Sequence, residues 1–171
     1  MKLINTYLAA LLLVCATGCA SDSEAKKKKQ EASTMRFFLE SPPQPNGRTM
    51  QAPIYRAQPY LVTIRDEPFL DEGDIASVSV EEDAGGFALR VEFNEHGKLI
   101  LEGVTAGQRG RRIAIYSTWT EARWLAAPVV RKTHSDGLFY FTPDASREEA
   151  ERIARGINNL IETLKRKSWV L

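Results

Sequence analysis

The end of the chain carries the feature that most constrains the fold, a long amphipathic helix. Ser146 and Glu149 have the spacing of a capping box, which predicts that a helix begins there. Apolar residues then recur at helical spacing, at Ala150, Ile153, Ala154, Ile157, Leu160, Ile161 and Leu164. The cations at 165–167 suit the end of the same helix, because they interact favourably with its dipole. Such a helix needs a broad apolar surface to lie on, and a β-sheet supplies one.

The segments before this helix show the alternation typical of β-strands. In 87–93 the apolar side chains share one face, whereas Arg90 and Glu92 lie on the other. The turn sequence at 81–86 joins this strand to 76–80, so we expect the two to form an antiparallel hairpin. Further strands are predicted at 35–40, 60–64, 113–116, 126–130 and 138–141.

One shorter helix is predicted at 95–106. Its apolar stripe is expected to comprise Leu99, Ile100, Gly103 and Val104. Strands, a short helix, more strands and a closing helix indicate the α+β class: a mostly antiparallel sheet with a short helix and a long C-terminal helix packed on one face. Residues 35–171 are enough for a single domain of this kind.

The N-terminus has the features of a bacterial lipoprotein signal. An apolar run at 8–14 is too short to cross a bilayer and matches the core of a signal peptide. Small residues at 16–18 then precede Cys19 in a pattern that resembles a lipobox. We therefore expect a signal peptide at 1–18, cleavage after Gly18 and acylation of Cys19. The alternative is an ordinary cleaved signal that leaves a free thiol.

The stretch after Cys19 is expected to be a tether. Residues 19–34 hold no large apolar side chain, which predicts a flexible, Lys-rich segment. The lysines at 26–29 are expected to solubilise it, and binding to anionic lipid is the alternative. The chain should then be membrane-bound through its lipid, in the bacterial cell envelope with the domain in the periplasm. By resemblance to enterobacterial sorting, the lack of an aspartate directly after Cys19 favours the outer membrane.

Charge and residue composition exclude several functions. Removal of residues 1–18 takes away Lys2 and leaves 22 basic and 22 acidic side chains, so the processed chain is neutral and we expect no nucleic-acid partner. Because Cys15 is removed with the signal and Cys19 is acylated, no cysteine remains for a disulfide or a thiolate metal site.

The residues that remain do not form a recognisable catalytic motif. His96 and His134 are the only imidazoles, and neither lies in a nucleophile motif, so we predict that the protein is not an enzyme and needs no cofactor. The acidic runs at 71–74 and 81–83 lack the spacing of a calcium loop, so no metal site is predicted.

The second half of the chain resembles the first periplasmic head subdomain of the SecD protein-export subunit. The matching features are VEFNEHG at 91–97, Thr105, GRRIAIY at 110–116, AAPVV at 126–130, Gly137 and ASREEAERIARGI at 145–157, with EPFLDEGDI at 67–75 upstream. This resemblance, which begins near residue 75, implies an α+β head fold and a link to protein export. No transmembrane segment is predicted, so we do not expect the export subunit itself. The segment STWTEARW at 117–124 replaces the tight turn usual in that family.

Two sets of residues are candidates for binding. Trp119 and Trp124, in the segment at 117–124, are expected to present apolar surface to a protein partner, and packing in the core is the alternative. Arg109, Arg111 and Arg112 flank a glycine and could bind an anion, whereas a solvated turn is the simpler interpretation.

Together these features predict a non-enzymatic envelope lipoprotein that contacts proteins, in the envelope or in the export machinery. The alternative is a module that binds a small ligand or an envelope polymer through the arginines and tryptophans.

Overall fold

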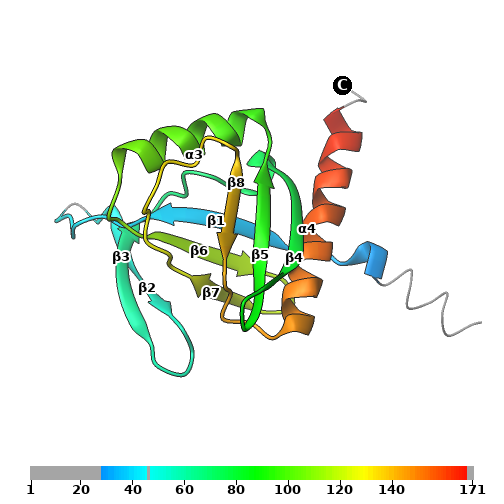
Figure 1. The fold of residues 1–171 in the computed structure, drawn as a ribbon, viewed down its shortest axis with the longest axis horizontal. Helices are drawn as coiled ribbons and strands as arrows, with labels where there is room; N and C mark the ends of the chain where they lie inside the picture. The colour runs from blue at the N-terminus through cyan, green and yellow to red at the C-terminus, as the bar shows by residue number, and fades with distance from the viewer. Residues whose placement is uncertain (1–27, 46, 169–171) are drawn as a thin grey trace, which may run out of the picture.

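The computed structural model of the protein describes residues 28–45 and 47–168 (Figure 1). In chain order the elements are β1 (Thr34–Leu39), β2 (Thr49–Ile54), β3 (Tyr60–Arg65), η1 (Glu72–Asp74), β4 (Ile75–Asp83), β5 (Gly86–Phe93), α3 (Glu95–Gly107), β6 (Ile113–Thr118), β7 (Ala122–Ala126), β8 (Leu138–Phe141) and α4 (Arg147–Ser168). These strands pair antiparallel and form three sheets, β1-β6-β7, β4-β5-β8 and β2-β3. The α+β class is confirmed, with the strands divided among three sheets.

The sheet β1-β6-β7 is the middle layer because both of its faces are apolar. On one face Phe37 and Ile115 join the main core, to which β4, β5, β8 and both helices contribute. On the other face Phe38 and Ala114 pack with the β2-β3 hairpin in a second, smaller core. Figure 1 shows the strands of β4-β5-β8 running across those of β1-β6-β7. A strand that is buried on both faces has a continuous apolar run rather than alternation.

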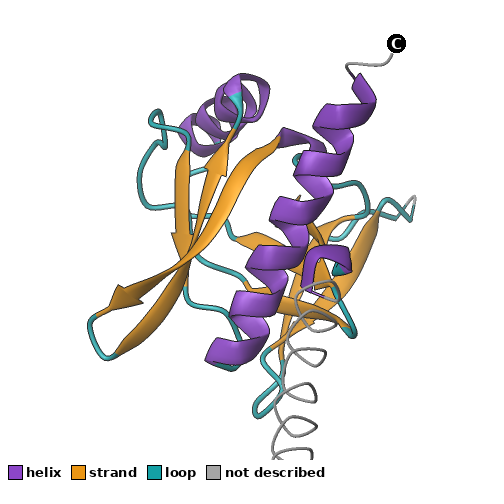
Figure 2. Ribbon diagram, turned by 90° about the vertical axis from the view of Figure 1, so that its right-hand side faces the viewer, coloured by secondary structure: helices purple, strands orange, loops and turns teal. Residues whose placement is uncertain are grey.

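The helix α4 closes one side of the molecule (Figure 2). Its capping box is formed as predicted: the Ser146 N–H donates to Glu149 Oε2 at 2.7 Å, and the Glu149 N–H donates to Ser146 Oγ at 3.2 Å. The predicted stripe is buried at Ala150, Ile153, Ala154, Ile157 and Ile161. Asn158 also covers the free edge of β4, because its side chain accepts from the Val78 N–H and donates to the Val78 carbonyl. No described helix is long and apolar enough to span a membrane.

The helix α3 begins where expected but buries a different face. Leu101 and Thr105 are fully buried, whereas Leu99 is 69% exposed. Of the predicted stripe, Ile100 packs against the main core and Val104 is half-buried, whereas Leu99 and Gly103 are exposed, so the centre of the packed face was predicted wrongly. The first turn sets the rotation of the helix, since a Cβ on Gly97 would lie 2.6 Å from the Asp74 carbonyl oxygen. Only glycine permits this close approach of helix and loop.

Two strands differ from the prediction. The strand β2 was not expected, because Pro53 and polar residues interrupt the apolar pattern there, yet Ala52 pairs with Val62 of β3 in regular register. The strand expected at 126–130 lies earlier, in β7, and beyond β7 only Val129 makes an isolated bridge, to Arg112.

The domain begins earlier than the predicted boundary. Residues 28–33, which we expected to belong to the tether, lie against α4, where Asn159 Nδ2 donates to the carbonyl of Glu31 at 2.9 Å. The segment docks through polar contacts, which an apolar-pattern analysis does not detect. The signal peptide, Gly18 and Cys19 lie outside the described residues.

Candidate functional site

The β6-β7 hairpin carries both tryptophans and places them on opposite faces. Trp119 lies in the turn and packs against the main core, with the Arg123 guanidinium 4.8 Å from its ring centre. Trp124 lies on β7 and packs with Phe38 and Tyr116 in the second core, at ring-centre distances of 5.2 and 4.9 Å. Both indoles are half-buried. The structure therefore does not bring the two tryptophans together in one surface.

A β-bulge sets the direction of Trp124. The register between β6 and β7 shifts so that Ile115 pairs with Ala126 and Tyr116 pairs with Trp124, which leaves Leu125 as the extra residue. Leu125 and Ala126 are consequently both buried. Trp124 is left facing the β2-β3 hairpin.

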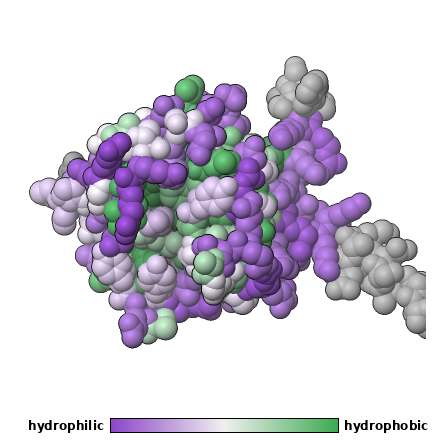
Figure 3. Space-filling model, in the orientation of Figure 1, coloured by the Kyte–Doolittle hydropathy of each residue, from purple (hydrophilic) through white to green (hydrophobic). Residues whose placement is uncertain are grey.

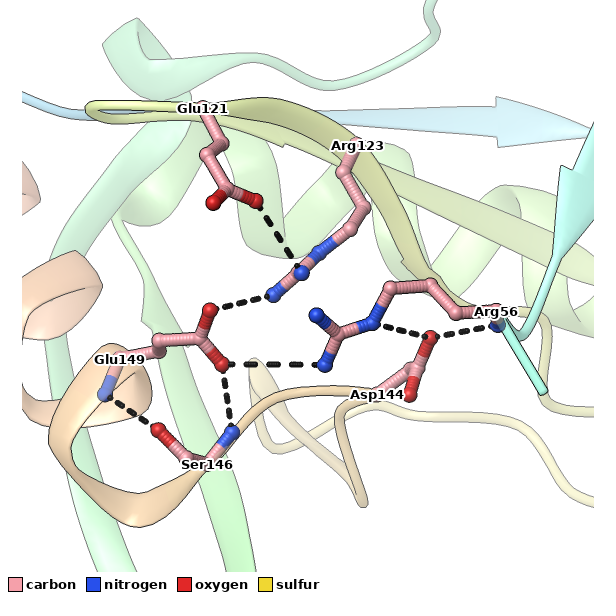
Figure 4. A network of polar contacts seen from close by, with 6 residues as sticks. All are labelled: Arg56, Glu121, Arg123, Asp144, Ser146 and Glu149. Atoms are coloured by element: carbon pink, nitrogen blue, oxygen red, sulfur yellow. Dashed lines mark hydrogen bonds and ion pairs between the residues drawn. The ribbon is translucent and has the colours of Figure 1, made fainter.

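Arg123 and Arg56 fasten the two hairpins to the start of α4 through a network of carboxylates (Figure 4). Arg123, whose side chain is 10% exposed, contacts Glu149 at 3.0 Å and Glu121 at 3.2 Å. Arg56, in the loop after β2, contacts Asp144 at 3.5 Å and Glu149 at 3.9 Å. Its backbone N–H also donates to Asp144 at 2.9 Å. Two guanidinium groups thus face three carboxylates, so this network offers no surplus positive charge to an anion.

Glu149 is the residue on which this network converges. The N–H of Ser146 lowers the pKa of the Glu149 carboxyl most strongly, and Arg123 and Arg56 lower it further, while partial burial opposes the shift. A carboxylate that stays ionised in the first turn of a helix also interacts favourably with the helix dipole. The network therefore holds α4, the β6-β7 hairpin and the loop after β2 in one arrangement.

A hollow of about 300 Å³ opens beside this network. Its lining comprises Pro53, Tyr55, Arg56, Pro59, Ala122, Arg123, Trp124 and Asp144. Tyr55 is 48% exposed, and its backbone is left-handed at φ 66°. Bulky residues rarely adopt this conformation, and such strain clusters at functional positions.

The lining of this hollow suits a segment of polypeptide. Two aromatic rings and two prolines offer apolar contact, and aromatic residues and arginine are enriched where proteins bind one another. Because Arg56 and Arg123 are already paired with carboxylates, a small anion would gain little there. We name this surface, defined by Pro53, Tyr55, Arg56, Pro59 and Trp124, the Trp124 hollow.

The three arginines of the candidate anion loop point to separate partners. Arg109 reaches Thr133 at 3.5 Å, and Arg111 reaches the Glu40 carbonyl at 3.4 Å. Arg112 donates to the Ala127 carbonyl at 3.0 Å, and its guanidinium lies 5.0 Å from the centre of the Tyr60 ring. The loop is therefore not arranged around one anion. Arg111 lines a polar hollow of about 460 Å³ beside β3.

Both histidines make hydrogen bonds that stabilise turns. His96 Nδ1 donates to Asp74 Oδ1 at 2.8 Å beside η1, and its side chain is 75% exposed. His134 Nδ1 donates to the Leu138 carbonyl at 2.9 Å, and its ring lies 5.3 Å from that of Phe139. Within the described ranges, no group of His, Cys, Asp and Glu side chains is placed to hold a metal ion.

Sequence reasoning selected Trp124 but missed the rest of its surroundings. Tyr55 and Arg56 lie in the loop after β2 and Asp144 lies before α4, so Arg56 meets Asp144 through a contact across 88 positions of sequence. Two prolines that flank a tyrosine and an arginine at 53–59 were the one local signal of an unusual loop.

Comparison by shape finds similar solved structures, whereas comparison by sequence finds no match. No protein-family model matches the chain, and a comparison with curated proteins finds no match. A structure of SecDF, described as a membrane component that enhances protein export, aligns with 82% of this chain and 68% of its own, at 21% identity and a TM-score of 0.56. SecDF in a super-membrane-facing form aligns equally well, with the same TM-score and identity, but over 20% of its own chain. A third, SecDF from Thermus thermophilus, aligns over 82% of this chain and 21% of its own at 20% identity and a TM-score of 0.45.

At this level of identity the likeness establishes the fold. The resemblance to the SecD head that the sequence suggests is confirmed in this sense, and it extends over 82% of the chain rather than from residue 75 alone. The chain spans about two thirds of the first SecDF chain and a fifth of the second.

Proposed function

We propose that this protein is a lipid-anchored component of the bacterial cell envelope whose SecDF-like domain contacts proteins of the export machinery and catalyses no reaction. The observation that carries this proposal is the fold shared with SecDF, a membrane component that enhances protein export. A fold alone does not transfer a function, so the contact surface has to be argued from this chain's own residues.

The anchor is supported by the sequence at 16–19. Cleavage after Gly18 exposes Cys19 for acylation, and several acyl chains hold a protein on a bilayer far more firmly than one. The domain is then in the periplasm, with the outer membrane as the favoured site. Cys19→Ala should abolish incorporation of labelled palmitate in cells and release the protein from the membrane fraction.

The Trp124 hollow is the proposed contact surface. It combines the exposed ring of Tyr55, the half-buried ring of Trp124, two prolines and charges that are already paired. It lies between two hairpins that the Arg56 and Arg123 network keeps in place. A partner segment placed there would cover apolar area without leaving a buried charge unpaired.

An export assay tests this proposal. Tyr55→Asn removes one ring of the hollow, and asparagine tolerates the left-handed backbone, so the fold should persist. We expect pulse–chase labelling to show slower maturation of secreted precursors in cells that carry this variant than in cells with the unchanged protein. Leu99→Ala, an exposed apolar change on α3, is the matched control and should mature precursors normally. Normal maturation with Tyr55→Asn and in cells that lack the protein would count against the export role.

A second candidate is binding of an envelope polymer or small ligand. It is favoured by the polar hollow of about 460 Å³ that contains Arg111, Glu40 and Leu61. Thermal stabilisation by soluble peptidoglycan fragments, lost in Arg111→Gln, would support it.

A further inference from the structure

Two segments that are far apart in the sequence lie side by side beyond the end of α3. The Gly110 N–H donates to the Val130 carbonyl at 2.9 Å, and the Val130 N–H donates to the Arg111 carbonyl at 2.8 Å. These bonds pair the two segments as a short ribbon. We call the segments, residues 108–112 and 129–133, the arginine ribbon.

The arginine ribbon holds no carboxylate of its own and gathers five cations, Arg109, Arg111, Arg112, Arg131 and Lys132. The neighbouring segments contribute the acidic residues Glu40, Glu102 and Asp136. Glu40 Oε2 accepts from the backbone N–H of Arg112 at 2.7 Å. Among the residues that the structure describes, however, no ion pair joins a cation of the ribbon to any carboxylate.

The arginines around α4 are in a different situation. Arg123, Arg147, Arg152 and Arg155 each contact a carboxylate. Cations that are held close together without such partners repel one another in the folded chain. The arginine ribbon therefore has positive charge that a negatively charged partner can neutralise.

The cations of the ribbon are spread over an open surface. Arg109, Arg131 and Lys132 are exposed, whereas Arg111 and Arg112 are half-buried. Figure 3 shows strongly hydrophilic side chains gathered at the left of the molecule, where Figure 1 places the C-terminal end of α3 and the start of β6. Because these side chains point to separate places, a chain with several negative charges suits them better than one small anion does.

The shape beside the ribbon favours a polypeptide over a membrane surface. Arg111 lies in the polar hollow of about 460 Å³, together with Pro42, Pro43 and Leu61. A carboxylate on a side chain can enter this hollow, whereas a flat layer of lipid head groups would meet only its rim. Leu61 is 59% exposed and offers apolar contact to the rest of such a segment.

The residue types of the ribbon also suit carboxylates. Four of its five cations are arginines. A guanidinium group can bind a carboxylate through two parallel hydrogen bonds, which a lysine cannot do. Acidic side chains of a protein are therefore well matched to this surface.

We propose that the arginine ribbon is a docking surface for an extended, acidic segment of a partner protein. Carboxylates of the segment pair with Arg109, Arg111 and Arg131, and its apolar side chains lie against Leu61. The ribbon is a different surface from the Trp124 hollow, so the inference does not depend on the proposed role in export. It shares Arg111 with the second candidate function and differs from it in the class of ligand.

Peptide binding in solution tests this inference. The chain from Ala20 onward keeps every residue of both cores, so it can be used without acylation. The probe is a fluorescein-labelled peptide of alternating glutamate and leucine or serine, and a second peptide carries glutamine at every glutamate. We expect fluorescence anisotropy to show binding of the glutamate peptide. Binding should be at least about tenfold weaker for the glutamine peptide and in about 0.5 M salt.

Two double variants separate the ribbon from an effect of net charge. Arg109→Gln combined with Arg131→Gln should weaken binding of the glutamate peptide at least about tenfold. Lys29→Gln combined with Arg166→Gln removes the same charge from exposed positions elsewhere and should leave binding within about twofold. Both variants should melt close to the temperature of the unchanged chain, because the replaced side chains are exposed. Equal loss of binding in both variants would overturn the inference, as would equal binding of the two peptides.

Vesicles test the other class of partner. Flotation with vesicles of phosphatidylethanolamine and phosphatidylglycerol that requires Arg109 and Arg131, with no binding of the glutamate peptide, would assign the ribbon to lipid head groups and overturn the inference. Crosslinking at the Trp124 hollow reports on the other surface. Failure of the ribbon to bind the peptide and failure of the export role are therefore told apart.

Discussion

At the scale of single residues, glycines mark the places where this fold is tightest. Gly97 packs against the backbone of Asp74, whereas Gly103 in the same helix has open space where a Cβ would lie. We predict that Gly97→Ala lowers the free energy of unfolding by about 1–3 kcal/mol through overpacking. Gly103→Ala should raise it by up to about 1 kcal/mol, because alanine favours a helix. Urea unfolding of both variants measures this, and equal effects would contradict the close approach.

The carboxylate of Glu149 gives a pH-dependent prediction. Its folded-state pKa is lowered, chiefly by the Ser146 N–H and then by Arg123, so the ionised group stabilises the fold above the unfolded-state pKa. This stabilisation is lost as the pH falls below about 4.3 and through the folded-state pKa. In Glu149→Gln the decline of unfolding free energy over that range should be shallower, as measured by chemical unfolding at a series of pH values. An unchanged slope would show that the network does not couple to folding.

At the scale of elements, substitutions in α3 can show which face of the helix packs against the core. Leu101 is fully buried and Leu99 is 69% exposed, although both lie in the same apolar stretch. Leu101→Ala should cost about 2–5 kcal/mol of unfolding free energy, because it removes apolar contacts and leaves a cavity. Leu99→Ala should stay within about 0.5 kcal/mol. Thermal or urea unfolding of both variants measures these changes in unfolding free energy. A larger loss for Leu99→Ala than for Leu101→Ala would mean that the helix is rotated relative to this structure.

The elements with strong local signals were predictable, and those fixed by tertiary contact were not. The capping box at Ser146 predicts the start of α4, and the alternation of apolar residues in β5 predicts its hairpin with β4. The strand β2 contains Pro53, and its apolar residues pack only because β3 and the second core are beside it. The rotation of α3 depends on Asp74, which lies 23 positions before Gly97 in the chain, so no periodicity within the helix could reveal it.

At the scale of the whole molecule, the candidate site shows why sequence reasoning stopped short. Trp124 stands out as a tryptophan in an unusual hairpin, but the hollow beside it needs the loop after β2 and the segment before α4. Three arginines close together in the sequence suggest one shared anion site. In the folded chain Arg109, Arg111 and Arg112 instead contact separate partners. The loop after β2, the strand β7 and the segment before α4 come together at the hollow only because the three layers pack on one another.

The packing of α4 also links the N-terminal segment to the proposed contact surface. The segment at 28–33 lies against the middle of α4, and Arg123 of the β6-β7 hairpin and Arg56 of the loop after β2 contact Glu149 in the first turn of the same helix. We therefore expect a domain that is tethered at Cys19 and leaves the Trp124 hollow open to other proteins.

The central claim is that this hollow contacts the export machinery, and photo-crosslinking in cells tests it most directly. A photoreactive residue at Tyr55 or at Trp124 should capture a component of the export machinery or an emerging secreted chain, while the same residue at Leu99 should not. Palmitate labelling and limited proteolysis of each variant would establish that it is anchored and folded. The contradicting result is no capture at either hollow position in anchored, folded protein, or the same capture at Leu99 as at the hollow.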